Sequence, residues 1–102
     1  MHRINSKAPS ECTDIAEVRS EIDSIDQHII DLLSRRFEYV KEVVKYKDPN
    51  MGSIEAPDRR REVLERRRLW AEEKGLDPNV VEHIYDHLIQ YFISEELKLI
   101  NV

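Results

Sequence analysis

The stretch Asp14-Ile-Ala-Glu-Val-Arg-Ser-Glu-Ile-Asp-Ser-Ile-Asp-Gln-His-Ile-Ile-Asp-Leu32 decides the fold. Its branched aliphatic residues recur at alternating steps of three and four, which places them on one face of an α-helix. Asp14 followed by Glu17 predicts a capping box at the start. Proline disfavours helical geometry in the residue before it, so Asp48-Pro49 predicts the end. The apolar seam comprises Ile15, Val18, Ile22, Ile25, Ile29 and Leu32.

This helix, predicted from Asp14 to Lys47, is too long for the domain that contains it. At ~1.5 Å per residue it measures roughly 50 Å. A compact domain of this size has a radius of gyration of only ~13 Å. The apolar seam therefore extends beyond its own fold and needs a partner.

Composition favours one all-helical domain. The chain has 102 residues, 36% of them charged, only 2 glycines and no strand-like alternation. A formal net charge of −5 argues against a general polyanion binder, and the single Cys12 fits a reducing compartment. Without an apolar run for a signal peptide or membrane span, a soluble cytoplasmic protein is predicted. Residues 1–11 are expected to form a flexible tail and residues 12–102 the helical domain.

The rest of the chain divides at local turn signals. Residues 48–56 are rich in turn formers and predict a mobile flap. Pro57 fits the first turn of a second helix, which ends at Gly75, a residue suited to a left-handed cap. Asp77 and Pro78 fit the N-cap and first position of a third helix. Three helices per chain are therefore expected.

Charged residues lie on the faces predicted to be apolar. Arg36 continues the seam, Arg19 lies beside it, and Lys47 follows Arg36 by eleven residues, close to three helical turns. Arg59 lies near the apolar face of the second helix, and Glu96 lies on that of the third. Several cations around an apolar pocket suit a small dianion, because the arginine fork binds carboxylates through two hydrogen bonds.

Each of these residues also has an interpretation without a ligand. Arg19 and Lys47 fit boundary residues whose stems cover apolar surface while their heads reach water. Arg36 fits a buried ion pair with Glu96. Several such residues in one short chain nevertheless favour a binding site.

Two further motifs are interpreted as exposed surface. His83 and His87 have the spacing of a metal-ligand pair, but no third ligand accompanies them, so no metal site is predicted. The runs Arg59-Arg-Arg61 and Arg66-Arg-Arg68 suggest nucleic acid. Acidic residues interleave with them at helical pairing distances, which favours a salt-bridged, solvent-facing surface.

The long helix resembles the first helix of the all-helical chorismate mutase family, and the resemblance covers roughly residues 12 to 100. Within the family it is most similar to the salicylate-forming isochorismate pyruvate lyases. The family likeness is carried by Val18-Arg-Ser-Glu-Ile-Asp-Ser-Ile-Asp26, Ile29-Ile-Asp-Leu-Leu-Ser-Arg-Arg36 and Val43-Val-Lys-Tyr-Lys47. The lyase likeness is carried by Glu11-Cys-Thr13, Ala56-Pro-Asp-Arg59 and Trp70-Ala-Glu-Glu-Lys-Gly-Leu-Asp77.

The resemblance implies an intertwined homodimer with two equivalent active sites, a dicarboxylate substrate, and neither metal nor cofactor. Arg36 matches the arginine that binds a substrate carboxylate within one protomer, and Arg19 matches the arginine donated by the partner's long helix. Lys47 matches the lysine at the ether oxygen, and Arg59 the arginine of the second helix. Glu96 occupies the position of a glutamine that is the second contact to the ether oxygen. Both an ionised carboxylate and a protonated hydrogen-bond donor are open for Glu96.

The choice of reaction depends on two positions. Many mutases of the family have acidic residues where this chain has Ala56 and Arg60, and the lyases lack both, so the resemblance favours isochorismate pyruvate lyase, an enzyme of salicylate biosynthesis. Chorismate mutase is the second candidate reaction. A non-enzymatic alternative is a helical module for dimerisation or nucleic-acid binding. A further alternative is a catalytically weak regulatory relative that binds an aromatic metabolite.

Overall fold

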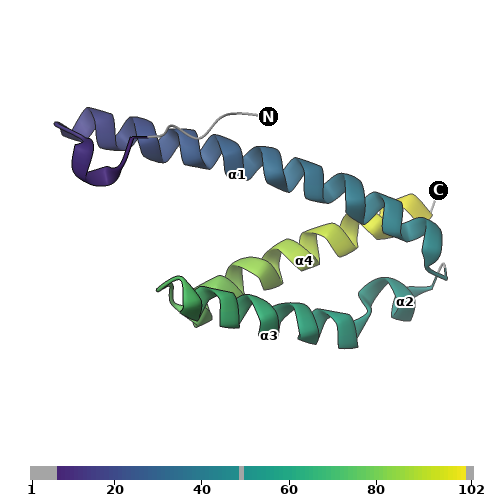
Figure 1. The fold of residues 1–102 in the computed structure, drawn as a ribbon. Coiled ribbons are helices and arrows are strands. Elements are labelled where there is room, and N and C mark those ends of the chain that lie inside the picture. The colour runs from purple at the N-terminus through teal and green to yellow at the C-terminus, as the bar shows by residue number, and fades with distance from the viewer. Residues whose placement is uncertain (1–6, 49, 101–102) are drawn as a thin grey trace. The chain divides into compact units, whose positions relative to one another are not determined.

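The computed structural model describes residues 7–48 and 50–100, and all regular secondary structure in those ranges is helical (Figure 1). The predicted all-α class with three long helices is confirmed. The chain forms two compact units, Met1–Tyr39 and Val40–Val102. No helix among the described residues is long and apolar enough to cross a membrane. In order, the elements are η1 (Pro9–Glu11), α1 (Ile15–Val43), η2 (Val44–Tyr46), α2 (Met51–Glu55), α3 (Pro57–Glu73) and α4 (Pro78–Ile100), where η marks a 3₁₀ helix.

Asp14 caps the start of α1 as predicted, but the Glu17 carboxylate accepts from the backbone N–H of Thr13 where a capping box would use that of Asp14. The backbone N–H of Glu17 donates to Asp14 Oδ1 at 2.8 Å, which satisfies one of the free donors at a helix start. The Glu17 carboxylate accepts hydrogen bonds from the Lys7 ammonium and from the hydroxyl and backbone N–H of Thr13. These bonds, with Lys7 the largest cause and Thr13 next, lower the pKa of Glu17 from 4.5 to about 2. Residues 1–6 lie outside the described range, so the flexibility of the tail stays a prediction there.

The apolar seam of α1 is exposed in the single chain. Ile22, Ile25 and Ile29 are 51%, 43% and 46% exposed. At ~1.5 Å per residue the 29 residues of α1 extend about 43 Å. Among the described residues, every buried apolar side chain belongs to the unit Val40–Val102. The seam of α1 is therefore an apolar surface that is exposed in the single chain.

The end of α1 differs from the prediction. The α-helix stops at Val43, and the tighter turn η2 follows. The backbone of Lys47 is extended, with φ −104 and ψ 150. A 3₁₀ helix has about three residues per turn and the Lys47 backbone is extended, so a count of α-helical turns from Arg36 does not apply to Lys47. Its predicted place near the stripe of Arg36 stays a prediction.

The segment predicted as an irregular flap contains the short helix α2. The side chain of Asn50 caps it by accepting from the backbone N–H of Ser53 at 2.8 Å. Ile54 in α2 is 1% exposed, and α2 packs against α4. The helix ends at Ala56, whose φ of 41 is left-handed. The segment is therefore not an irregular loop, because a capped helix with a buried side chain forms there; the predicted mobility of the flap stays a prediction.

Helices α3 and α4 form a hairpin and lie side by side (Figure 1). Gly75 ends α3 with a φ of 75, and the backbone N–H of Leu76 donates to Ala71 O at 2.8 Å, as in a Schellman cap. Asp77 Oδ1 accepts from the backbone N–H of Asn79 at 2.9 Å at the start of α4. The predicted boundaries at Pro57, Gly75 and Asp77-Pro78 are confirmed.

The hairpin is held by apolar packing and by stacking of one arginine. The guanidinium carbon of Arg67 lies 4.6 Å from the centre of the Trp70 ring and 5.4 Å from that of Tyr85, so cation–π attraction joins the two helices. With Ile54, the buried apolar side chains of the described residues are Val63, Ala71, Phe92 and Ile93.

Candidate active site

Two of the predicted site residues meet in the unit Val40–Val102. The Lys47 ammonium donates to Glu96 Oε1, with 3.0 Å between Nζ and Oε1. Glu96 lies on α4 and is 4% exposed, whereas Lys47 lies just after η2 and is half-buried. A charged residue this deeply buried is rarely found without an opposite charge. The ion pair explains how Glu96 is accommodated in the core.

A second acceptor holds the same ammonium. Lys47 Nζ donates to the backbone carbonyl of Ile54 at 3.4 Å. Lys47 is therefore held from α4 by a carboxylate and from α2 by a carbonyl. Sequence reasoning missed Ile54, and the available signal was that it is the one branched aliphatic residue in the segment 48–56.

The Lys47–Glu96 pair can act on an oxygen that gains negative charge. Water is largely excluded around Glu96, so charge interactions there are stronger than at the surface. In the described arrangement Glu96 accepts a hydrogen bond from Lys47. A protonated Glu96 that donates to a bound substrate stays a prediction.

Arg59 lies at the start of α3 and is exposed. Its Nη1 donates to Glu62 Oε1 at 2.9 Å on the same helix. An exposed pair at this spacing contributes only ~0.5 kcal/mol, so a substrate carboxylate can replace Glu62 at little cost. The structure is compatible with the predicted role of Arg59, which stays a prediction.

Arg60, the next residue, is held by α4. Its Nε and Nη2 donate to Asp86 Oδ1 at 3.1 and 2.8 Å, and its Nη1 donates to Gln90 Oε1 at 3.3 Å. These hydrogen bonds join the start of α3 to the middle of α4. Sequence reasoning noted Arg60 only as a missing acid and did not identify Asp86 as its partner.

The remaining predicted contacts, Arg19 and Arg36, both lie on α1 within the unit Met1–Tyr39. Arg19 is exposed and Arg36 is half-buried. The structure brings Lys47 and Glu96 together within the other unit. The contributions of Arg19 and Arg36 to the site, and the pairing of Arg36 with Glu96, stay predictions.

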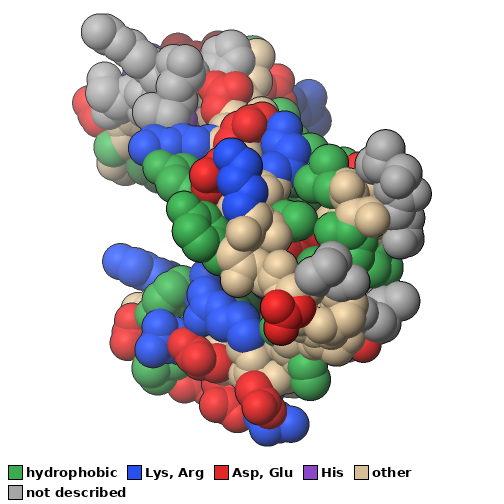
Figure 2. All heavy atoms as spheres, turned by 90° about the vertical axis from the view of Figure 1, so that its right-hand side faces the viewer, with side chains coloured by type: hydrophobic (Ala, Val, Ile, Leu, Met, Phe, Trp, Pro, Cys, Tyr) green, Lys and Arg blue, Asp and Glu red, His purple; other side chains and the backbone are tan. Residues whose placement is uncertain are grey.

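The arginine runs of α3 are charge-paired rather than collected into a basic patch. Every arginine from residue 59 to 68 has an acidic partner within salt-bridge distance or lies over an aromatic ring. On the face drawn in Figure 2, Asp and Glu side chains lie among the Lys and Arg side chains. The pairs are Arg59–Glu62, Arg60–Asp86, Arg61–Asp58, Arg66–Glu62 and Arg68–Glu82, and Arg67 lies over Trp70. The predicted salt-bridged surface is confirmed.

The predicted histidine pair is also surface. His83 and His87 are both exposed, and His83 Nδ1 lies 2.8 Å from the backbone oxygen of Asn79. Among the described residues, no group of three or more potential ligands is arranged to hold a metal ion.

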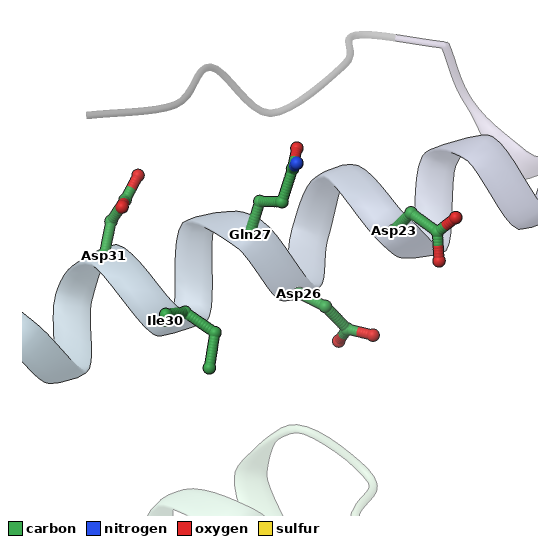
Figure 3. Close-up of a pocket in the computed structure, with 5 residues that line it drawn as sticks. All are labelled: Asp23, Asp26, Gln27, Ile30 and Asp31. Atoms are coloured by element: carbon green, nitrogen blue, oxygen red, sulfur yellow. The ribbon is translucent and has the colours of Figure 1, made fainter.

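A hollow of about 440 Å³ on α1 has the wrong charge for a dianion. In Figure 3, Gln27 and Asp31 point to one side of the helix and Asp26 and Ile30 to the opposite side. Asp23 adds a third carboxylate to the lining. A dicarboxylate would be repelled there.

Comparison with known proteins identifies relatives along most of the chain. Residues 18–97 match the family described as chorismate mutase type II. The chain is 40% identical over 92 residues to the isochorismate pyruvate lyase of Pseudomonas aeruginosa, which is 90% of each chain. It is 31% identical over 77 residues to the chorismate mutase of Methanocaldococcus jannaschii, or 76% of this chain and 78% of that one. The T-protein of Haemophilus influenzae is 39% identical over 82 residues, which are 80% of this chain but 22% of the T-protein.

Proposed function

The chain belongs to the chorismate mutase type II family and is an enzyme of the lyase or isomerase type, and within the family we propose that it converts isochorismate to salicylate and pyruvate. The observation that carries the proposal is the 40% identity to an isochorismate pyruvate lyase over 90% of both chains. The identity of residue 60 supports it, because many mutases of the family have an acid where this chain has Arg60. The guanidinium at this position is bound to Asp86 and Gln90, so the position offers no carboxylate to a substrate hydroxyl.

The proposed reaction needs electrostatic stabilisation and positioning rather than a protein nucleophile. The ether bond between the ring and the enolpyruvyl group breaks, and the hydrogen on the hydroxyl-bearing ring carbon moves to the enolpyruvyl methylene carbon. The ring becomes aromatic, and the enolpyruvyl group leaves as pyruvate. Lys47 faces the ether oxygen and stabilises the negative charge that builds there. Glu96 holds Lys47 in place as an ionised carboxylate; only a protonated Glu96 could donate a second hydrogen bond to that oxygen.

The arginines hold the substrate in its reactive conformation. Arg36 binds one carboxylate through its two-pronged fork, and Arg19 from the partner chain binds the other. Arg59 releases the Glu62 carboxylate and binds a carboxylate of the substrate in its place. Holding both ends of a flexible dianion removes much of the orientational entropy from the barrier.

The proposed assembly is an intertwined homodimer. It is supported by the exposed seam of α1, in which Ile25 and Ile29 are 43% and 46% exposed. A helix with one apolar face is stabilised by packing that face, and a second α1 supplies a matching surface. The unfolding midpoint is then expected to rise with protein concentration.

Two inactive variants test the dimer and the shared site together. Arg19→Ala and Lys47→Ala chains are each expected to be inactive alone. When the two variants are mixed and refolded together, half of the dimers should be mixed, and each mixed dimer has one intact site of its two. About a quarter of wild-type activity should therefore return. A folded monomer at micromolar concentration, or no recovery on mixing, would contradict the shared site.

An assay with both substrates tests the reaction. Purified protein is supplied with isochorismate and, separately, with chorismate, and salicylate and prephenate are quantified. Salicylate from isochorismate is the expected main product, lost in Arg36→Ala and retained in the matched control Arg35→Ala, whose residue is an exposed neighbour. Arg36→Lys should restore activity only in part, because one ammonium does not reproduce the guanidinium fork.

Chorismate mutase activity is the second candidate, and the similarity to the Methanocaldococcus jannaschii chorismate mutase favours it. Prephenate from chorismate as the main product would establish this activity in place of the lyase. A nucleic-acid-binding module is disfavoured by the charge pairing of the α3 arginines. Salt-dependent retention on DNA or RNA, with neither substrate consumed, would favour it instead.

A further inference from the structure

The Lys47 ammonium is held by two acceptors from different elements. Glu96 Oε1 on α4 lies 3.0 Å from Nζ, and the Ile54 carbonyl oxygen on α2 lies 3.4 Å from it. A lysine ammonium has three N–H donors and no acceptor. These two acceptors direct two of the donors, and among residues 7–48 and 50–100 no further acceptor for the ammonium is found, so its third donor can serve a ligand.

This arrangement fixes the direction of the third donor. The lysine side chain is long and flexible, so a single acceptor leaves the ammonium free to rotate and to swing on its stem. Two acceptors at different positions restrict both motions. The Ile54 carbonyl, the longer of the two contacts, therefore adds a second constraint to the direction that Glu96 gives the remaining N–H.

The position of the Ile54 carbonyl depends on the Ile54 side chain. That side chain is 1% exposed, and α2 packs against α4. Backbone hydrogen bonds from Ile54 N to Asn50 O at 3.1 Å and from Ala56 N to Gly52 O at 3.0 Å hold the short helix around it. A five-residue helix has too few internal hydrogen bonds to be stable alone. The buried side chain is therefore the anchor that places the carbonyl.

We propose that Ile54 is a positioning residue: its buried side chain holds its own carbonyl against Lys47 and thereby aims the third N–H at the ether oxygen of the substrate. The inference rests on the function proposed above. It assigns to α2 a role in the chemical step through Lys47, beyond closure of the chain between α1 and α3.

Shortening the Ile54 side chain tests the proposal. Ile54→Ala should lower kcat about tenfold, less than the loss of a whole charge-stabilising donor, because the ammonium remains but is poorly aimed. KM should change less than twofold, because the carboxylate contacts are untouched. Ile54→Val keeps most of the side chain and should lower kcat about twofold, which preserves a readout if Ile54→Ala does not fold.

Val63→Ala is the matched control, because Val63 is also buried in the same unit but lies on α3. It should lower the melting temperature and leave kcat per folded molecule unchanged. If Ile54→Ala and Ile54→Val behave like Val63→Ala, Ile54 is only a packing residue and the proposal is wrong.

A measurement without turnover separates this proposal from the proposed function. The ¹³C chemical shift of the Ile54 carbonyl should change in Lys47→Met and stay unchanged in Lys45→Met, whose ammonium pairs with Glu42 instead. An unchanged shift in Lys47→Met would overturn the inference whatever the activity. If the shift changes in Lys47→Met but the wild-type protein consumes neither substrate, the contact is supported and the proposed function is refuted.

Discussion

The buried ion pair between Lys47 and Glu96 predicts a large loss of stability when the lysine charge is removed. Lys47→Met keeps most of the apolar stem but removes the ammonium. The Glu96 side chain is 6% exposed and that of Lys47 22% exposed, so little water can replace the lost partner. The carboxylate is then left buried and unpaired.

The expected magnitude follows from this burial. Removing one partner of a buried pair costs about 3–5 kcal/mol, and the partial exposure of Lys47 places this pair at the lower end, about 3 kcal/mol. An exposed pair provides the comparison. Lys45 and Glu42 are 3.0 Å apart with side chains 69% and 53% exposed, so Lys45→Met should cost less than ~0.5 kcal/mol.

Urea unfolding followed by circular dichroism measures both effects, with all proteins at one concentration. The double variant Lys47→Met/Glu96→Leu removes both charges and should be more stable than Lys47→Met alone, because no charge remains buried. The coupling between the two sites should exceed about 1.5 kcal/mol. Additive losses, or a loss in Lys47→Met no greater than in Lys45→Met, would refute the reasoning from burial.

Acidification should loosen the start of α1, because the folded-state pKa of Glu17 is lowered to about 2 from 4.5. The stability from Glu17 is present above its unfolded pKa and is lost as the pH falls through 4.5 towards 2. The hydrogen-exchange protection factor of the Thr13 amide should fall over the same pH range. In Glu17→Gln it should lose this pH dependence. Gly75→Ala should lower the free energy of unfolding in urea by about 1 kcal/mol. The added Cβ meets no atom within 4 Å, but a φ of 75 is strained for a residue with a side chain. An unchanged unfolding midpoint would contradict this. Arg60→Ala and Asp86→Asn should each cost about 1 kcal/mol and the double variant little more, whereas fully additive losses would show that the two residues act independently.

Helix boundaries were predictable where a residue's own backbone preference sets them. Gly75 adopts a left-handed φ that other residues resist, and Pro78 fits a first turn that needs no donor from it. Asp14 caps α1 through a bond to a residue three positions along. Each signal is local, so the sequence alone was sufficient to predict it.

The α2 segment and the direction of Lys47 depend on packing instead. Gly52 and Asn50 indicate a turn, and only the burial of Ile54 against the rest of its unit makes a short helix stable there. The end of α1 in a 3₁₀ turn then directs Lys47 toward Glu96. Helical periodicity contains neither effect, so it indicated Lys47 and Glu96 as candidate site residues without predicting that they form an ion pair.

The arginines of the proposed site show the other limit. Arg19 and Arg36 are assigned by resemblance to sites shared between two chains, and a single chain contains only half of such an arrangement. The exposed seam of α1 supports the proposed partner chain. The charge pattern along one helix does not determine how the second chain places its own arginine.

The most direct test of the central claim is the fate of one hydrogen atom. Isochorismate carrying deuterium on the hydroxyl-bearing ring carbon is incubated with the protein in ordinary water, and the pyruvate is analysed by mass spectrometry. Direct transfer within an electrostatically stabilised transition state predicts salicylate together with pyruvate that carries one deuterium in its methyl group. Salicylate accompanied by unlabelled pyruvate would contradict direct transfer, and the absence of salicylate would contradict the proposed lyase itself.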